Sequence, residues 1–129
     1  MDKVVHFEIT YEDQERAKDF YRTVFEWDLN DVPMGGGMNY TTATTVPIDE
    51  QMMPTEPGAI NGGVTTKGAE TPAPVVTIQV DSIDDTLKKI EAEGGSVVTP
   101  RTPIQDMGAF AYFKDSEGNT MGLFEANRG

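Results

Sequence analysis

One order of elements occurs twice in this chain and constrains its fold more than any single motif does. A strand pattern runs directly into a helix start near residue 13, and the same succession returns near residue 82. A constant shift of 69 residues (from 6 to 75) lays the segment 6–13 over the segment 75–82. Because the superposed residues are mostly different, the pattern alone indicates an α+β fold and leaves open whether that fold is duplicated.

The first half begins with a strand and continues with a helix. Residues 3–10 alternate in polarity as a half-buried strand does, with His6 and Glu8 on the face opposite Phe7. An acidic run at 12–15 is typical of a helix start, since carboxylates are stabilised by the positive end of the helix dipole. Apolar residues at helical spacing then predict a helix over about 13–26, strands at 27–32, 38–46 and 60–66, and a loop at 47–59.

The second half repeats this order after a break. Gly68, Pro72 and Pro74 interrupt the pattern and predict a linker at about 67–74. Beyond it we expect a strand at 75–80, a helix that Ser82 caps and Gly94 ends, and strands at 96–99, 109–114 and 120–126. We predict a single domain over 1–129, with internal halves of about 1–67 and 74–129.

Composition excludes several classes of partner and chemistry. The chain contains no cysteine, so disulfides, thiolate metal sites and a cysteine nucleophile are ruled out. Its 22 acidic residues against 10 Lys and Arg give a net charge of −12, which repels nucleic acid and anionic membranes. The acidity serves either general solubility or life in a high-salt cytoplasm. With no signal peptide and no apolar run near 18 residues, we expect a cytoplasmic protein.

Three motifs, in this order, resemble a known family. Residues 6–9 (His-Phe-Glu-Ile) lie on the first strand, and the helix segment 12–21 (Glu-Asp-Gln-Glu-Arg-Ala-Lys-Asp-Phe-Tyr) follows. Residues 80–84 (Val-Asp-Ser-Ile-Asp) form the second junction, and residues 115–119 (Asp-Ser-Glu-Gly-Asn) form the turn before the last strand. Together they resemble the vicinal oxygen chelate superfamily, which includes glyoxalases, bleomycin resistance proteins and dioxygenases.

The resemblance implies a particular architecture. Two βαβββ modules form a cupped eight-stranded mixed sheet, with the helices packed on the outer faces and a cavity between the strands. Such proteins are usually homodimers, and we expect a homodimer here. We also expect a small-molecule ligand as the partner, and neither a nucleic acid nor a membrane.

The resemblance also implies four metal-ligand positions, and this sequence fills them poorly. His6 matches the first position, whereas Val75 and Gly122 stand at two others and cannot coordinate an ion. The fourth falls within 61–63, Asn-Gly-Gly. A catalytic divalent ion requires about three protein ligands and an open position. We therefore expect no metal site and no cofactor, with a divalent metal bound partly by a partner chain as the alternative.

Two polar residues of the first strand are the candidate catalytic groups. His6, the single histidine, has an ordinary pKa near 6.5 and can serve as a general acid or base, and Glu8 can orient it or share its proton. The alternatives are a structural histidine and a solvated carboxylate. Parity predicts further ligand-binding residues, for each of which ordinary sheet packing is the alternative: Thr77, Gln79 and Phe124. Tyr40 and Tyr112 are additional candidates, although the sequence does not give the face on which either lies.

Three functions remain open from the sequence. The first is a metal-free protein of the glyoxalase and bleomycin-resistance type that binds a small organic molecule in a cavity between strands. The second is a lyase or isomerase of the superfamily that uses His6 and Glu8, with or without a divalent metal. The third is an interaction module. A phosphate loop is excluded, because neither Lys-Ser/Thr nor a helix follows the flexible glycine turn predicted at 35–37.

Overall fold

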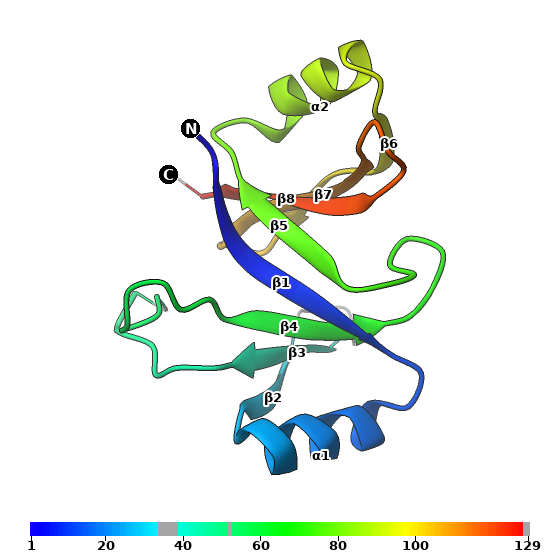
Figure 1. Cartoon of the computed structure of the whole chain (residues 1–129). Helices are drawn as coiled ribbons and strands as arrows, with labels where there is room; N and C mark the ends of the chain where they lie inside the picture. Colours follow the sequence, from blue (N-terminus) through cyan, green and yellow to red (C-terminus); the bar gives the residue numbers. More distant parts are fainter. Residues whose placement is uncertain (34–38, 52, 128–129) are drawn as a thin grey trace. The chain divides into compact units, whose positions relative to one another are not determined.

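The computed structural model describes residues 1–33, 39–51 and 53–127, and in these ranges it contains two helices and eight strands (Figure 1). The glycine turn predicted at 35–37 lies outside the described residues. Contacts divide the chain into two units, residues 6–74 and residues 1–5 together with 75–129. Each module runs strand, helix, three strands, so the predicted α+β class and its two βαβββ modules are confirmed.

The first module has its opening strand beside its closing strand. Its elements are β1 (Lys3–Tyr11), α1 (Gln14–Phe25), β2 (Asp28–Pro33), β3 (Asn39–Thr44) and β4 (Gly62–Thr66). The strand order is β2-β3-β4-β1. β1 pairs parallel with β4, where Glu8 lies opposite Gly63, and the other two pairs are antiparallel.

The second module repeats this topology. Its elements are β5 (Val75–Gln79), α2 (Ile83–Ala92), β6 (Ser96–Ile104), β7 (Gly108–Lys114) and β8 (Thr120–Ala126). The strand order is β5-β8-β7-β6, and β5 pairs parallel with β8, where Thr77 lies opposite Gly122. Because opening and closing strands pair in parallel in both modules, the weak sequence repeat corresponds to a repeated fold.

The sixth strand is longer than the sequence predicts. β6 continues to Ile104, well past the expected end at Thr99, although it contains Pro100 and Pro103. Proline lacks an N–H donor and is tolerated on an edge strand or at a bulge. β6 pairs only with β7 within its module, and its register shifts on both sides of Thr99. Pro100 lies within the second of these shifts, whereas Pro103 pairs in register with Ala109, so neither proline ends the strand.

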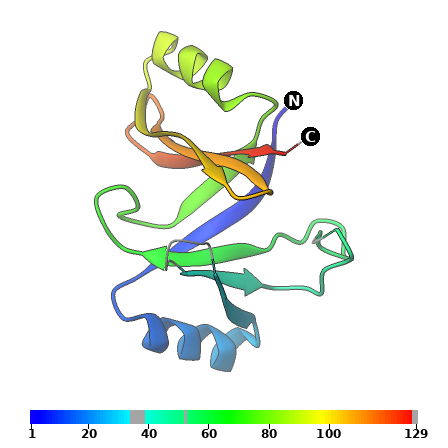
Figure 2. The ribbon, with the colours of Figure 1, turned by 180° about the vertical axis from the view of Figure 1, so that it is seen from behind.

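Helix α2 is fixed by apolar packing. The Ser82 hydroxyl caps its first turn by accepting a hydrogen bond from the Asp85 N–H at 3.2 Å. Ile83 is completely buried, and Leu87 is buried beside it against β6, β7 and β8 (Figure 2). This cluster, which includes Leu123, is the main hydrophobic core of the second module.

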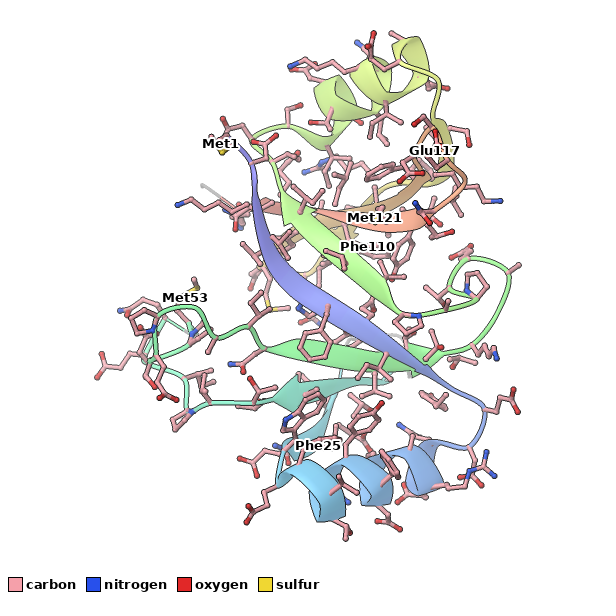
Figure 3. The ribbon with its side chains drawn as sticks, viewed as in Figure 1. Met1, Phe25, Met53, Phe110, Glu117 and Met121 are labelled. Carbon is pink, nitrogen blue, oxygen red and sulfur yellow. The ribbon has the colours of Figure 1, made fainter. Side chains whose placement is uncertain are left out.

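Helix α1 is fixed differently, by a polar network. Its one buried residue is Lys18, whose ammonium group lies 3.2 Å from Asp31 of β2 and 3.1 Å from Glu15. The Thr41 hydroxyl donates to Asp31 at 2.7 Å, and these contacts lower the pKa of Asp31. Phe20, Val24 and Phe25 are each 54% exposed, and Phe25 lies at the C-terminal end of α1 (Figure 3). Tyr21 is partly buried and packs against the apolar cluster of Leu29 and Val64.

Replacing Ile83 with Ala should lower the free energy of unfolding by about 2–5 kcal/mol. Removal of a buried aliphatic side chain loses its transfer free energy and leaves a cavity in the core of the second module. Urea denaturation at 25 °C measures the change.

Val24→Ala in α1 is the matched control, since the Val24 side chain is 54% exposed. It should cost well under half of the Ile83 effect. Equal losses for the two variants would contradict the packing described for α2.

Candidate functional site

Three polar side chains of the first module meet on one face of its sheet. The alternation of β1 directs Phe7 toward the cluster of Leu29 and Val64, and it directs His6 and Glu8 to the opposite face. Tyr40 of β3 lies on that face too. Its hydroxyl is 3.0 Å from His6 Nε2 and 3.1 Å from Glu8 Oε2.

The Tyr40 hydroxyl has one proton, and this fixes the direction of the hydrogen bonds. When Glu8 is ionised, Tyr40 donates to Glu8 Oε2, and its oxygen then accepts from His6 Nε2–H. The chain His6 Nε2–H to Tyr40 Oη–H to Glu8 carboxylate therefore requires the tautomer of His6 that carries its proton on Nε2. We call these three residues the His6–Tyr40–Glu8 triad.

A glycine makes room for the tyrosine. Gly63 is buried in β4 beside Glu8, and a Cβ atom built on it would overlap the hydroxyl end of Tyr40. Any side chain at position 63 would therefore displace the Tyr40 ring from the position between its two partners. The triad depends on this glycine as much as on its own members.

Burial controls the charge of the histidine. Desolvation lowers the pKa of His6 from its ordinary 6.5 to about 4. Glu8 itself is only 6% exposed. At neutral pH the imidazole is consequently uncharged and acts as a hydrogen-bond partner, and the carboxylate faces two neutral groups.

The second module holds the other candidate residues, in two rows across its strands. Thr77 of β5, Gly122 of β8 and Tyr112 of β7 lie opposite one another, and both side chains are buried. The next row on the same face joins the exposed Gln79 to the partly buried Phe124. Phe110 completes that row and packs edge-on against Tyr112, with ring centroids 5.6 Å apart.

The metal-ligand positions implied by the resemblance do not fit an ion. A Cβ atom at Gly122 would meet the Thr77 hydroxyl at 2.6 Å, so the space of a ligand side chain is already filled. Val75 is buried and offers no donor atom. Asn61 Oδ1 is engaged locally, accepting from the Thr45 N–H at 2.7 Å and from the Val46 N–H at 3.2 Å. Within the described ranges no three His, Asp or Glu side chains gather as a metal site.

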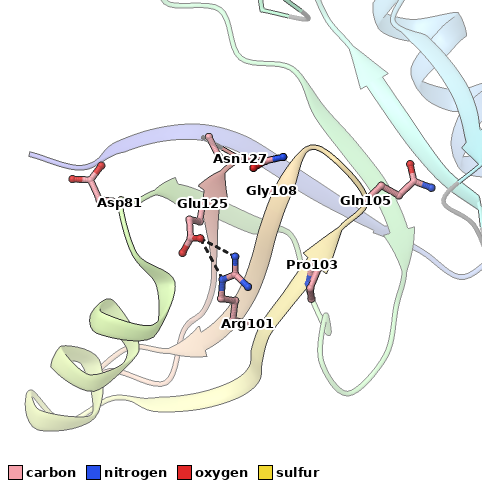
Figure 4. A pocket seen from close by; sticks show the side chains of 8 residues that line it. Asp81, Arg101, Pro103, Gln105, Gly108, Glu125 and Asn127 are labelled. Atoms are coloured by element: carbon pink, nitrogen blue, oxygen red, sulfur yellow. Dashed lines mark hydrogen bonds and ion pairs between the residues drawn. The ribbon is translucent and has the colours of Figure 1, made fainter. Parts of the chain in front are cut away.

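Glu125 is a structural carboxylate. Its Oε1 accepts from the Ile83 N–H at the start of α2 at 2.8 Å, and its Oε2 accepts from Arg101 at 2.9 Å (Figure 4). A polar pocket of about 290 Å³ adjoins this pair, with Asp81 on its wall. Glu125 thus stabilises the N-terminus of α2, in agreement with its parity along β8, which is opposite to that of Gly122.

Parity within β1 was enough to place His6 and Glu8 on one face, but Tyr40 could not be placed from the sequence. Its position depends on the pairing of β3 with β4 and on the empty space at Gly63. The one available signal was the pair of glycines at 62–63 in a predicted strand, since such glycines mark a close approach of another group.

The repeated βαβββ topology is that of the vicinal oxygen chelate proteins. The sequence matches the family described as "Glyoxalase/Bleomycin resistance protein/Dioxygenase superfamily" over residues 3–123. The chain therefore belongs to this family.

Curated relatives agree with this assignment. The chain is 34% identical over 118 residues to "Putative glyoxylase CFP32" of Mycobacterium bovis and to the protein of the same name from Mycobacterium tuberculosis. The match covers 90% of this chain and 42% of each relative, so the chain spans less than half of their length.

Solved structures share the fold at low sequence identity. A methylmalonyl-CoA epimerase in complex with methylmalonyl-CoA and NH4+ superposes with a TM-score of 0.65 at 13% identity, covering 99% of this chain and 96% of that one. The hypothetical protein BH1468 from Bacillus halodurans C-125 gives the same TM-score at 14% identity, with the same coverage. In the described part of the chain, neither helix has the length and apolar character needed to cross a membrane.

The single histidine makes the triad directly measurable. In ¹⁵N-labelled protein with any tag removed, the His6 ring should titrate with a pKa of about 4 and show the Nε2–H tautomer at pH 7. Tyr40→Phe removes the acceptor and should abolish the tautomer preference. A His6 pKa near 6.5 in the wild type would contradict the burial of the ring.

The free energy of unfolding should also depend on pH through the protonation of His6. Because the unfolded chain binds a proton near pH 6.5 and the folded chain only near 4, the free energy of unfolding should fall as the pH falls through this window. His6→Gln should remove that part of the pH dependence. Wild-type and variant urea titrations at pH 7, 5.5 and 4.5 measure the difference, and parallel curves would refute the assignment.

Proposed function

We propose that this chain binds a small organic molecule at the face of the His6–Tyr40–Glu8 triad without the catalytic metal of its superfamily. The observation that carries the proposal is the state of the implied ligand positions. Of the implied ligand positions, His6 alone carries a group that metal sites commonly use, and its Nε2 is already hydrogen-bonded to Tyr40. Gly122 and Gly63 have no side chain, and the Asn61 Oδ1 accepts hydrogen bonds from backbone N–H groups.

The chemistry of the triad supports an organic ligand. A neutral imidazole, a phenol hydroxyl and a carboxylate provide a few polar anchors, which is the usual way a pocket orients a small molecule. The residues predicted to line a ligand site in the second module stay predictions: Thr77, Gln79, Phe124 and Tyr112. Homodimerisation and a cytoplasmic location also stay predictions, as does the single-domain organisation.

A second candidate function is that of an isomerase or lyase in which His6 and Glu8 act as acid and base. The hydrogen-bonded chain through Tyr40 favours it, because a carboxylate and an imidazole joined in this way can exchange protons with a bound molecule. Solved structures of methylmalonyl-CoA epimerase share the fold and so add a reaction class to test.

Metal addition tests the first proposal. Incubation with Zn²⁺, Mn²⁺, Fe²⁺ or Ni²⁺ should leave the melting temperature within about 2 °C of the apo value, because a metal that binds only the folded protein raises stability with its affinity. Elemental analysis of the same samples should find less than one tenth of an ion per chain. A stoichiometric metal that is lost in His6→Ala would overturn the metal-free proposal.

Proton exchange tests the second candidate. With methylmalonyl-CoA as the first probe, NMR in D₂O should detect loss of its carbon-bound α-hydrogen, and Glu8→Gln should slow this at least 100-fold, the usual contribution of a general base. Ser116→Ala, in the exposed turn of the second module, is the control. Exchange that persists in both Glu8→Gln and His6→Ala would exclude this pair as the acid–base groups.

A further inference from the structure

Within residues 61–63, where the family resemblance implies a fourth ligand position, the place of one absent side chain is filled by a hydroxyl group. Gly63 is the residue of β4 that lies beside Glu8, and the end of the Tyr40 side chain occupies the position of the missing Cβ. Tyr40 comes from a different strand and is held there by two hydrogen bonds. The sheet thus holds the Tyr40 hydroxyl at the position that a side chain of residue 63 would occupy.

We propose that the Tyr40 hydroxyl takes the role of the missing metal and donates a hydrogen bond to the enolate oxygen that forms when an enolisable carbonyl ligand loses a proton. This inference rests on the proposed binding of a small molecule at the triad. It goes further by naming the group that contacts the ligand oxygen and the class of compound that it recognises.

The hydrogen bond between Tyr40 and Glu8 determines when Tyr40 can donate to the ligand oxygen. When Glu8 removes a proton from the carbon next to the carbonyl, the C–H electron pair forms a C=C bond and the carbonyl π pair moves to oxygen. Once protonated, Glu8 can donate a hydrogen bond to Tyr40 Oη, which reverses the direction of the hydrogen bond between the two side chains. The Tyr40 O–H then turns to the new enolate oxygen. Return of the proton from Glu8 to carbon restores the carbonyl, so every atom and charge is accounted for.

His6 strengthens this donor. Its Nε2–H donates to Tyr40 Oη, which polarises the phenol and makes its proton a better hydrogen-bond donor. The imidazole does this while uncharged, so it adds no positive charge that would stabilise the ionised form of Glu8. His6 is in this sense a positioning residue, and Tyr40 touches the ligand.

Charge defines the ligand class. The triad contains one carboxylate and two neutral groups, so a ligand whose reacting oxygen is already anionic would meet Glu8 with like charge. A neutral carbonyl compound avoids this, because its oxygen becomes negative only as Glu8 becomes neutral. The expected ligands are aldehydes, ketones or thioesters with an acidic hydrogen on the adjacent carbon.

Substituted phenols test the proposal as mimics of the enolate oxygen. Glu8→Gln reproduces the neutral, protonated carboxyl, and in this variant affinity should rise steadily as the phenol becomes more acidic. Adding Tyr40→Phe should weaken binding at least tenfold and flatten that trend, since removal of one oxyanion-hole donor from an enzyme costs a factor of about 10²–10³ in kcat. Isothermal titration measures Kd for each pair.

Two glycine variants distinguish the loss of the Tyr40 hydrogen bond from a general disturbance of the fold. Gly63→Ala should displace the Tyr40 hydroxyl and weaken phenol binding as Tyr40→Phe does, whereas Gly68→Ala, where a Cβ atom meets nothing within 4 Å, should leave it unchanged. Should Gly63→Ala fail to fold, the conservative Tyr40→Phe still decides. Binding that is equal with and without Tyr40 overturns this inference and keeps the proposed binding function. Failure of every phenol to bind any variant overturns both.

Discussion

The parallel pairing of the opening and closing strands in each module sets the chemistry of this protein. In the first module it places Glu8 beside Gly63, and in the second it places Thr77 beside Gly122. Both closing strands thus present a glycine where a polar side chain of the opening strand lies next to it. In each case the vacant volume is taken by a hydroxyl group, from Tyr40 in the first module and from Thr77 itself in the second. A side chain at Gly63 or Gly122 would therefore require the neighbouring hydroxyl group to move.

Much of this fold follows from the sequence, for physical reasons. The strand-to-helix junctions are marked by local signals, such as the Asp13 and Ser82 side chains that cap the two helices. The alternation of β1 separates His6 and Glu8 from Phe7 without any knowledge of the partner strand. By contrast, the extension of β6 through Pro100 and Pro103 depends on its place at the edge of the strand order, which no local pattern reveals.

Helix α1 shows where local reasoning has its limit. Apolar spacing predicts its position correctly, yet the buried residue is Lys18 and the apolar Phe20 and Val24 are more than half exposed. The reason is a partner farther along the chain, since the ammonium group pairs with Asp31 of β2, and the Thr41 hydroxyl of β3 donates a hydrogen bond to the same carboxylate. A buried amine is stable only with such partners, and they were not recognisable from the helix sequence.

The position of Tyr40, like that of Lys18, depends on partners from other strands. This position limits the kind of chemistry that the site can support. A divalent ion would bring two positive charges to the carboxylate of Glu8, whereas the triad as built brings none, because His6 is neutral. An additional negative charge in a buried site is costly when only neutral donors face it. A new negative charge on a ligand is therefore best stabilised here if the carboxylate of Glu8 becomes neutral in the same step. A triad of this composition is therefore suited to moving one proton between a ligand carbon and Glu8. It is poorly suited to reactions that require a permanent cation, and this sets the proposed chemistry apart from that of the metal-using members of the superfamily.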